Sequence, residues 1–215
     1  MVKEQMVKMN SRVWLSVILA SLLGTSQAYA QGDAAAGKEQ AVACAACHGQ
    51  DGATGLDGTY PNLAGQNEKY LVAQLKLIQS GDRPIPLMAG QLDGKSEQNL
   101  ADLAAYYASL PAKVGQASGD DEALAQAQQI YRGGIARKDV AACSACHNPR
   151  GIGNADAGFP RISGQPVEYT IAQLTAYREA ERTSDEAFGS MMRDIAHGLT
   201  DGEIAALADY LQGLN

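Results

Sequence analysis

The sequence predicts an all-helical protein made of two similar domains in tandem. The chain has 215 residues, enough for two domains of about 90 residues each. The pentads CAACH (44–48) and CSACH (143–147) lie 99 positions apart, and YPNLAGQNEKYLVAQL (60–75) matches FPRISGQPVEYTIAQL (159–174) at the same offset. Apolar residues recur at helical spacing, and no clear alternating strand pattern is present. A tandem duplication explains this organisation better than chance does.

Residues 1–30 are predicted to be a signal peptide. Three basic residues precede an apolar run at 13–24, and the small-residue pattern AYA ends at Ala30. We therefore expect the mature chain to begin at Gln31 and to be exported. A retained membrane anchor is the alternative, although the run is shorter than the roughly 20 apolar residues that a spanning helix needs.

The first domain is expected to span residues 31–112. The Ala-rich segment before its pentad has helical composition. The segment 68–81 places four side chains on one helical face by their spacing, namely Tyr70, Leu71, Leu75 and Ile78. The last helix is predicted to follow the N-cap residue Ser96. It carries an apolar stripe formed by Leu100, Leu103, Tyr107 and Leu110.

The second domain is expected over residues 122–215, after a linker at 113–121 that is rich in Gly, Ala, Ser and Asp. Its last helix is predicted to follow Thr200, which forms a capping-box pattern with Glu203. The corresponding apolar stripe consists of Ile204, Leu207, Leu211 and Leu214. The offset between the domains grows from 99 to 104 near TSDEAFG, so the second domain has five extra residues there.

The mature chain is acidic and short of core material. Without residues 1–30 it retains 14 of 17 basic and 23 of 24 acidic residues, a net charge of −9, which argues against nucleic acid as a partner. A domain of fewer than about 100 residues is marginally stable alone, and the Gly-rich loop after the first pentad cannot pack densely. We therefore expect a large apolar group to fill the centre of each domain.

The pentad Cys-x-x-Cys-His is the attachment signature of c-type haem. Residues three apart on a helical turn lie on one side, so two thiols can form thioethers with the two vinyl groups at one porphyrin edge. The adjacent histidine can then ligate the iron. We predict two haem c groups. Their attachment and proximal residues are Cys44, Cys47 and His48 in the first domain, and Cys143, Cys146 and His147 in the second.

Three other chemistries use paired cysteines. A thioredoxin-like redox pair needs a βαβ setting, of which the sequence gives no sign. A zinc site would have to join pairs separated by 96 positions, between Cys47 and Cys143, far from the usual ligand spacing. A plain disulfide in each pair is the simplest alternative in an exported chain. Two matched pentads, each with histidine next, favour haem over all three.

Met88 and Met192 are predicted as the second axial ligands. Each lies eight residues before the N-cap of the last helix of its domain. Thioether ligation opposite histidine is usual in electron-carrying cytochromes c and raises the reduction potential. Core packing is the commoner role of a methionine, and Met191 is a rival because it is adjacent to Met192.

Pro61 and Pro160 are predicted to support the histidines. Each lies 13 residues after the haem histidine of its domain. A proline carbonyl can accept the free imidazole N–H and so fix the orientation and basicity of the ring. An ordinary turn proline is the alternative. His197 has no counterpart in the first domain, and we expect it to be a surface residue and not a ligand.

With these motifs the chain resembles the class I cytochromes c, and specifically the two-domain cytochrome c4 family. The resemblance covers nearly the whole mature chain, including CAACHG, CSACHN, YPNLAGQ, FPRISGQ and the terminal DYLQGL. It implies two tandem class I cytochrome c domains, each wrapped around one covalently bound haem, that meet across a pseudo-twofold interface. It also implies the cysteine, histidine and methionine roles given above.

The resemblance implies a periplasmic carrier of single electrons that catalyses no bond chemistry itself. The expected partners are a quinol–cytochrome c reductase, a terminal oxidase, the membrane surface and, during maturation, the haem-attachment machinery. One alternative is the dihaem electron-transfer subunit of a flavoprotein sulfide dehydrogenase. A second is a dihaem peroxidase, but that activity needs an open iron, and the paired Met88 and Met192 argue against it.

The loops after the two pentads predict different reduction potentials. The first loop carries Asp51 and Asp57 and no basic residue, whereas the second carries Arg150, Arg161 and Asp156. Nearby positive charge favours the reduced state of the iron. We therefore hypothesise that the C-terminal haem has the higher potential, so that an electron entering at the N-terminal haem moves to the C-terminal one.

Overall fold

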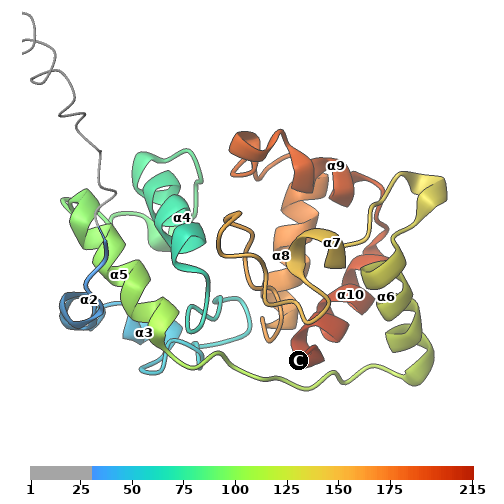
Figure 1. Cartoon of the computed structure of the whole chain (residues 1–215), viewed down its shortest axis with the longest axis horizontal. Helices are drawn as coiled ribbons and strands as arrows, with labels where there is room; N and C mark the ends of the chain where they lie inside the picture. Colours follow the sequence, from blue (N-terminus) through green and yellow to red (C-terminus); the bar gives the residue numbers. More distant parts are fainter. Residues whose placement is uncertain (1–30) are drawn as a thin grey trace, which may run out of the picture.

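The computed structural model describes residues 31–215, and the predicted signal peptide lies outside the described residues. The described chain forms two helical domains side by side, joined by a segment that runs along one edge of both (Figure 1). Within residues 31–215 there is no β-strand, only the isolated bridges Ile135–Val140 and Asn154–Phe159. The predicted all-helical class is therefore confirmed. No helix in this range is long and apolar enough to cross a membrane.

The N-terminal domain is built from helices whose ends follow local sequence signals. Its elements are α2 (Ala34–Gln40), α3 (Ala45–His48), α4 (Glu68–Ser80), η1 (Pro86–Met88) and α5 (Glu97–Ser109). Helix α4 is followed by its C-cap residue Gly81, which adopts the left-handed conformation that glycine takes at least cost. Ser96 caps α5 as predicted, and the Asn99 side-chain oxygen accepts the backbone N–H of Ser96 at 3.0 Å. The local signals therefore determine where these helices begin and end.

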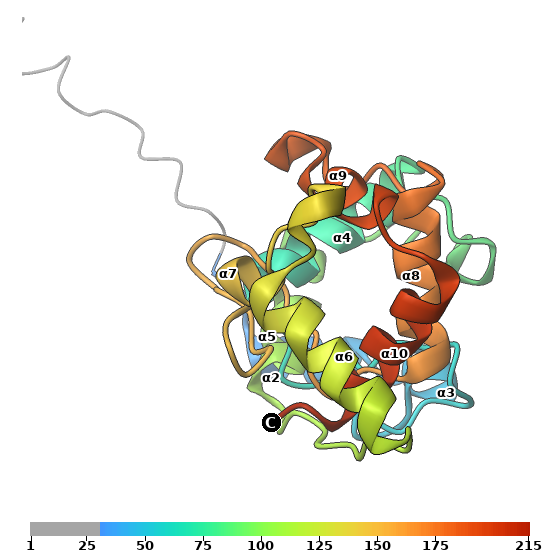
Figure 2. The same cartoon turned by 90° about the vertical axis from the view of Figure 1, so that its right-hand side faces the viewer.

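The C-terminal domain repeats this plan with additions. Its elements are α6 (Asp121–Gly133), η2 (Ala136–Lys138), α7 (Ser144–His147), α8 (Val167–Arg178), η3 (Glu186–Phe188), α9 (Met191–His197) and α10 (Asp201–Gly213). Helix α6 begins at Asp121, the last residue of the expected linker. The predicted capping box of Thr200 and Glu203 is present at the start of α10. Seen end-on, the helices of this domain surround a common centre (Figure 2).

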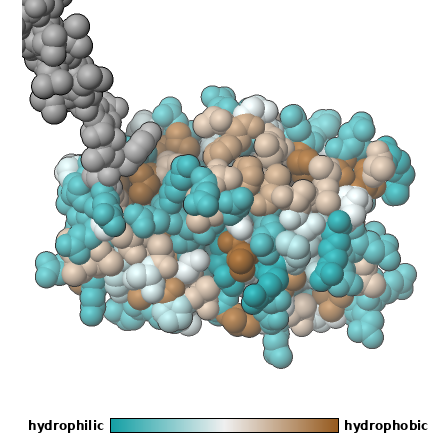
Figure 3. Space-filling model, viewed as in Figure 1, coloured by the Kyte–Doolittle hydropathy of each residue, from teal (hydrophilic) through white to brown (hydrophobic). Residues whose placement is uncertain are grey.

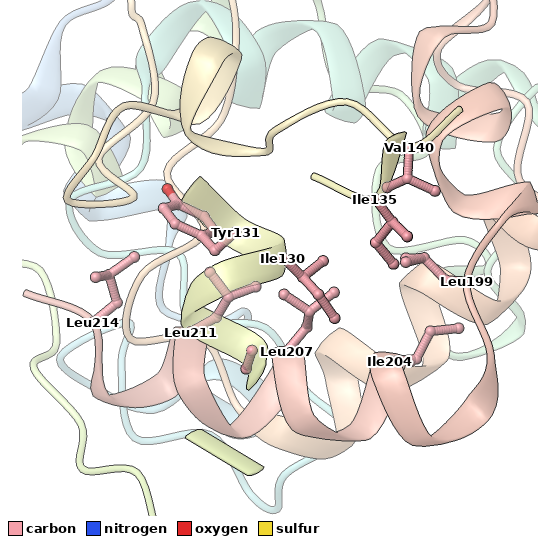
Figure 4. Packing of buried hydrophobic residues seen from close by; sticks show 10 residues of the cluster. Ile130, Tyr131, Ile135, Val140, Leu199, Ile204, Leu207, Leu211 and Leu214 are labelled. Atoms are coloured by element: carbon pink, nitrogen blue, oxygen red, sulfur yellow. The ribbon is translucent and has the colours of Figure 1, made fainter. Parts of the chain in front are cut away.

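Each domain has its own apolar core on the predicted helix faces. In the C-terminal domain Ile204, Leu207, Leu211 and Leu214 are all buried. They pack with residues of α6 and of the segment after it, and Figure 4 shows these side chains gathered over one side of α10. In the N-terminal domain Leu103 and Tyr107 pack against Leu71 of α4. The outer face in Figure 3 is largely hydrophilic, with scattered apolar residues.

Equivalent residues of the two domains meet in the interface between them. Gln66 bonds the backbone of Arg161, with its Nε2 donating to the carbonyl at 2.8 Å and its Oε1 accepting from the N–H at 2.7 Å. Gln165 bonds the backbone of Asn62 in the same way, at 2.8 and 3.0 Å. The 99-residue offset relates Gln66 to Gln165 and Asn62 to Arg161. The interface is therefore locally pseudo-twofold, as the resemblance implies.

Two arginines extend the same symmetry. Arg83 and Arg182, equivalent positions in the repeat, are each 7% exposed. Each guanidinium reaches side chains of both domains. Arg83 donates to Gln74, Gln173 and Tyr169, whereas Arg182 donates to Gln173, Gln74 and Tyr70. The two domains thus share one buried polar cluster, formed by these six side chains and called the interface cluster below.

The structure corrects one detail of the predicted α4 face. Tyr70 was expected to share the core face with Leu71, but it lies in the interface cluster instead. Its hydroxyl accepts a hydrogen bond from Arg182 Nη2 at 2.9 Å. A hydroxyl removed from water needs such a partner, and Arg182 of the other domain supplies it.

Candidate haem sites

The two pentads adopt the same local structure. In the first, Cys44 is the N-cap of α3, and its carbonyl accepts from Cys47 N–H at 3.2 Å and His48 N–H at 3.0 Å. In the second, the Cys143 carbonyl accepts from the next cysteine and from His147 at 3.3 and 2.9 Å. This single turn places both sulfurs of a pentad on one side. All four cysteines are free thiols, so they are chemically able to form thioethers.

Both pentad histidines are buried and held through one ring nitrogen. His48 Nδ1 lies 3.1 Å from the Pro61 carbonyl oxygen, and His147 Nδ1 lies 3.0 Å from that of Pro160. With Nδ1 donating to the carbonyl, Nε2 is the nitrogen left for a metal. Burial lowers the pKa of His48 and of His147, and the proline hydrogen bonds only partly oppose this. Both rings are therefore kept in the neutral form that iron ligation requires.

The methionines lie in two different local structures. Met88 ends the short helix η1, and Met192 is the second residue of α9. Both side chains are partly buried. Met191, the rival to Met192, is 37% exposed, and its Sδ lies 3.9 Å from Cys146 Sγ. Met191 thus lies beside Cys146 of the second pentad, whereas Met192 keeps the repeat register of Met88. His197 is exposed at the end of α9, as expected.

The polar groups around the sites test whether a haem group fits them. Within residues 31–215, three buried polar side-chain atoms have no hydrogen-bond partner: Arg83 Nε, Arg161 Nε and Ser163 Oγ. All three belong to the interface cluster or to the segment that bonds across it. Among residues 31–215, no carboxylate forms an ion pair with Arg83 or Arg182.

A buried guanidinium without an anion is costly. The polar atoms without a hydrogen-bond partner, and the two arginines without a carboxylate partner, could therefore bind a group that carries its own carboxylates. Each haem carries two such groups, its propionates. The residues present fit haem for this reason. No three His, Cys, Asp or Glu side chains of the described range cluster as a purely protein-bound metal would need.

The interface cluster is the feature of the sites that sequence reasoning did not identify. The signal was present, because Tyr70, Gln74 and Arg83 recur as Tyr169, Gln173 and Arg182 at the 99-residue offset. Repetition alone does not tell a residue that faces its own domain from one that faces the other. The burial of both arginines and their contacts across the interface supply that distinction.

Comparison with known proteins agrees with this geometry. A family model described as Cytochrome c matches residues 34–111 and 121–215. Cytochrome c4 of Pseudomonas aeruginosa is 45% identical over 202 residues, which cover 94% of this chain and 98% of the relative. The crystal structure of reduced recombinant cytochrome c4 from Pseudomonas stutzeri has a TM-score of 0.81 and 41% identity, covering 86% of this chain and 100% of that one. A protein named thiosulfate dehydrogenase electron acceptor, from Stutzerimonas stutzeri, is 34% identical and covers 94% of this chain and 95% of its own length.

The family model matches each domain separately, and each matched region contains one pentad. The fold, the duplicated histidine–proline geometry and the relatives agree with one another. The chain therefore belongs to the cytochrome c4 family of c-type electron carriers and bears two covalently attached haem c groups, one in each domain.

Proposed function

We propose that the mature chain is a periplasmic carrier that passes single electrons from a membrane quinol-oxidising complex to a terminal oxidase or a similar acceptor. It catalyses no bond chemistry; the haems change oxidation state, and the protein sets their potentials and its docking to partners. The observation that carries this proposal is the duplication itself. Each domain offers a buried histidine oriented by a proline carbonyl, together with a methionine in the same repeat register.

We assign the iron ligands as His48 with Met88 and His147 with Met192. Cys44 and Cys47 attach the first haem, and Cys143 and Cys146 the second. Two ligands from the protein would close each iron, which suits electron transfer. A peroxidase needs an open position, so the assignment also excludes that activity from the proposal.

Mass and absorption of the mature holoprotein test the assignment. We expect two haem additions per chain, and a chain that begins at residue 31. Met88→Ala and Met192→Ala should each remove half of the weak long-wavelength band that marks methionine ligation of ferric haem. Met191→Ala, the matched control, should leave the band intact. Loss of half the band in Met191→Ala but not in Met192→Ala would reverse the assignment in the C-terminal domain.

A second candidate is supported by the relative named thiosulfate dehydrogenase electron acceptor. In this candidate the carrier receives its electrons from a dehydrogenase that oxidises a sulfur compound, which is close to the sulfide dehydrogenase alternative expected from the sequence. Reduction rates of the oxidised protein by quinol-treated membranes and by a purified sulfur-compound dehydrogenase discriminate the two. Fast reduction by the dehydrogenase alone would favour the second candidate. Peroxide turnover by the pure protein would contradict both.

A further inference from the structure

The extra residues of the C-terminal domain form a hydrogen-bonded turn just before α9, the helix that contains Met192. They lie near TSDEAFG, residues 183–189, where the repeat offset grows from 99 to 104. This segment includes η3 and Asp185, which is only 3% exposed. The Asp185 carbonyl accepts from the N–H groups of Phe188 and Ser190, at 2.9 and 3.2 Å, so the turn is closed by backbone hydrogen bonds.

The Asp185 carboxylate binds the residue that follows Met192. Its Oδ2 accepts the backbone N–H of Arg193 at 2.9 Å, and its Oδ1 accepts Nε of the same arginine at 2.8 Å. The Arg193 guanidinium also donates to Ser190 Oγ at 2.8 Å. Ser190, the N-cap residue of α9, makes no side-chain capping bond itself. Asp185 thus supplies the missing cap from outside the helix and fixes both the backbone and the side chain at position 193.

In the described part of the N-terminal domain no carboxylate binds a residue beside Met88; the segment after it is held by Gln79 Nε2, which donates to the carbonyls of Leu92 and Lys95 at 2.7 and 2.9 Å. Met88 lies at the end of η1, and its N–H donates only to the Ile85 carbonyl, at 2.9 Å. Among the described residues, none of positions 84–95 takes part in an ion pair. Leu87, next to Met88, is 67% exposed. The two methionines therefore differ in how firmly the protein holds the backbone beside them.

We propose that Asp185 is a positioning residue for Met192. Its hydrogen bonds to Arg193 make the Met192 thioether harder to displace from the iron than the Met88 thioether. A buried carboxylate with charge-assisted hydrogen bonds to one residue strongly restricts that residue, and Met192 is its immediate neighbour. Ligand displacement requires the methionine segment to move away. That motion breaks the Asp185 contacts in the C-terminal domain but breaks no ion pair in the N-terminal one.

The inference rests on the proposed ligand role of Met192, and an imidazole titration of the oxidised holoprotein tests it. Imidazole competes with methionine for ferric iron, and loss of the long-wavelength band reports the displacement. We expect two phases of equal amplitude, with the N-terminal haem reacting at lower imidazole concentration; Met88→Ala and Met192→Ala identify the phases. In Asp185→Ala the C-terminal midpoint should fall by about tenfold or more, as expected when a buried charged partner is removed, and the N-terminal midpoint should not move.

Two further variants make the result specific. Asp185→Asn retains an acceptor for the Arg193 N–H and should shift the C-terminal midpoint by less than Asp185→Ala does; it also decides the case if Asp185→Ala fails to fold. Glu186→Ala is the matched control, because the Glu186 carboxylate is 74% exposed and lies 3.8 Å from the same guanidinium. It should leave both midpoints unchanged.

Equal midpoints for the two wild-type haems, or folded Asp185 variants that bind imidazole like the wild type, would overturn the inference and leave the proposed function intact. A Met192→Ala protein that retains the whole band would overturn the ligand assignment, and the inference with it.

Discussion

At the scale of single residues, equivalent positions in the two domains have diverged in charge. Asn99 and Glu203 occupy the same place in the two capping boxes. Glu203 additionally binds Lys138 Nζ, at 2.7 and 2.9 Å, and is 7% exposed. Burial acts to raise the pKa of Glu203, but hydrogen bonds from Lys138 and Thr200 outweigh it, and the pKa lies below its ordinary value. The C-terminal capping box therefore contributes pH-dependent stability.

We expect Glu203→Gln to destabilise the C-terminal domain by about 1–2 kcal/mol at pH 7. Because the folded pKa is below the unfolded one, the contribution is present above about pH 4.3, the ordinary value for glutamate. It is lost as the pH falls through the folded pKa. Denaturant unfolding at neutral and acidic pH should show the difference between variant and wild type shrinking toward zero in acid.

The control for this substitution is Glu97→Gln. Glu97 lies 2.9 Å from Lys76, but its side chain is 82% exposed. Exposed pairs of this kind contribute little, so this variant should unfold like the wild type at both pH values. An equal loss of stability in the two variants would show that burial of Glu203 is not what matters.

At the scale of elements, each domain depends on a close crossing of its first and last helices. In the N-terminal domain α2 crosses α5 at Gly37, where an added Cβ would lie 2.0 Å from the Asp102 backbone oxygen. In the C-terminal domain the fully buried Ala127 lies in α6, which packs against α10. Small residues, Gly37 and Ala127, allow the helices to approach closely at both crossings.

Gly37→Ala should destabilise the N-terminal domain by about 1–3 kcal/mol, the usual cost of overpacking. The atom that it would meet belongs to the backbone of α5 and cannot rotate away. Thermal unfolding of the holoprotein measures the effect.

Gly133→Ala is the matched control, since Gly133 ends α6 and nothing lies within 4 Å of the added Cβ. It should be neutral or stabilise by up to about 1 kcal/mol. If Gly37→Ala proved as harmless as Gly133→Ala, the α2–α5 crossing would have to be looser than the structure has it.

At the scale of the whole molecule, the interface cluster places two positive charges in contact with both domains. Arg83 and Arg182 are related by the repeat and each contacts both domains. They should therefore raise the two haem potentials to a similar extent. A difference between the haems must come from groups that are not shared. The loops after the pentads supply such groups: Asp51 is replaced by Arg150 and Asn62 by Arg161 in the second domain, whereas Asp57 is matched by Asp156.

We expect the C-terminal haem to have the higher potential, in agreement with the hypothesis from the loop charges. Asp51 and Asp57 are exposed, so salt should screen their effect and narrow the difference between the haems. Replacing both by Asn should raise the N-terminal potential and leave the C-terminal one unchanged. Redox titration at low and high ionic strength, with Met88→Ala and Met192→Ala as labels, measures this; a higher N-terminal potential would contradict the electrostatic argument.

Features that depend on residues close together in the chain could be predicted before the structure was known. The pentads, the helix caps at Ser96 and Thr200 and the reach from each histidine to its proline involve short separations. The spacing of the residues along the chain is enough to predict the capping hydrogen bonds and the histidine–proline hydrogen bonds. The repeat also revealed the two domains, because a duplicated fold keeps its local signals in register.

Which polar residues of those helices face the other domain depends on how the two domains pack, and the folded structure is needed to show it. Tyr70 and Arg182 are 112 positions apart, and Arg83 and Gln173 are 90 apart. The folded structure also joins Asp185 to Arg193, a contact with no counterpart in the first domain from which to infer it. Helical periodicity gives the direction of a side chain around its own axis, but what that side chain meets depends on how the domains and loops are packed. The burial of charge, which sets the cost of leaving a group unpaired, exists only once that packing is complete.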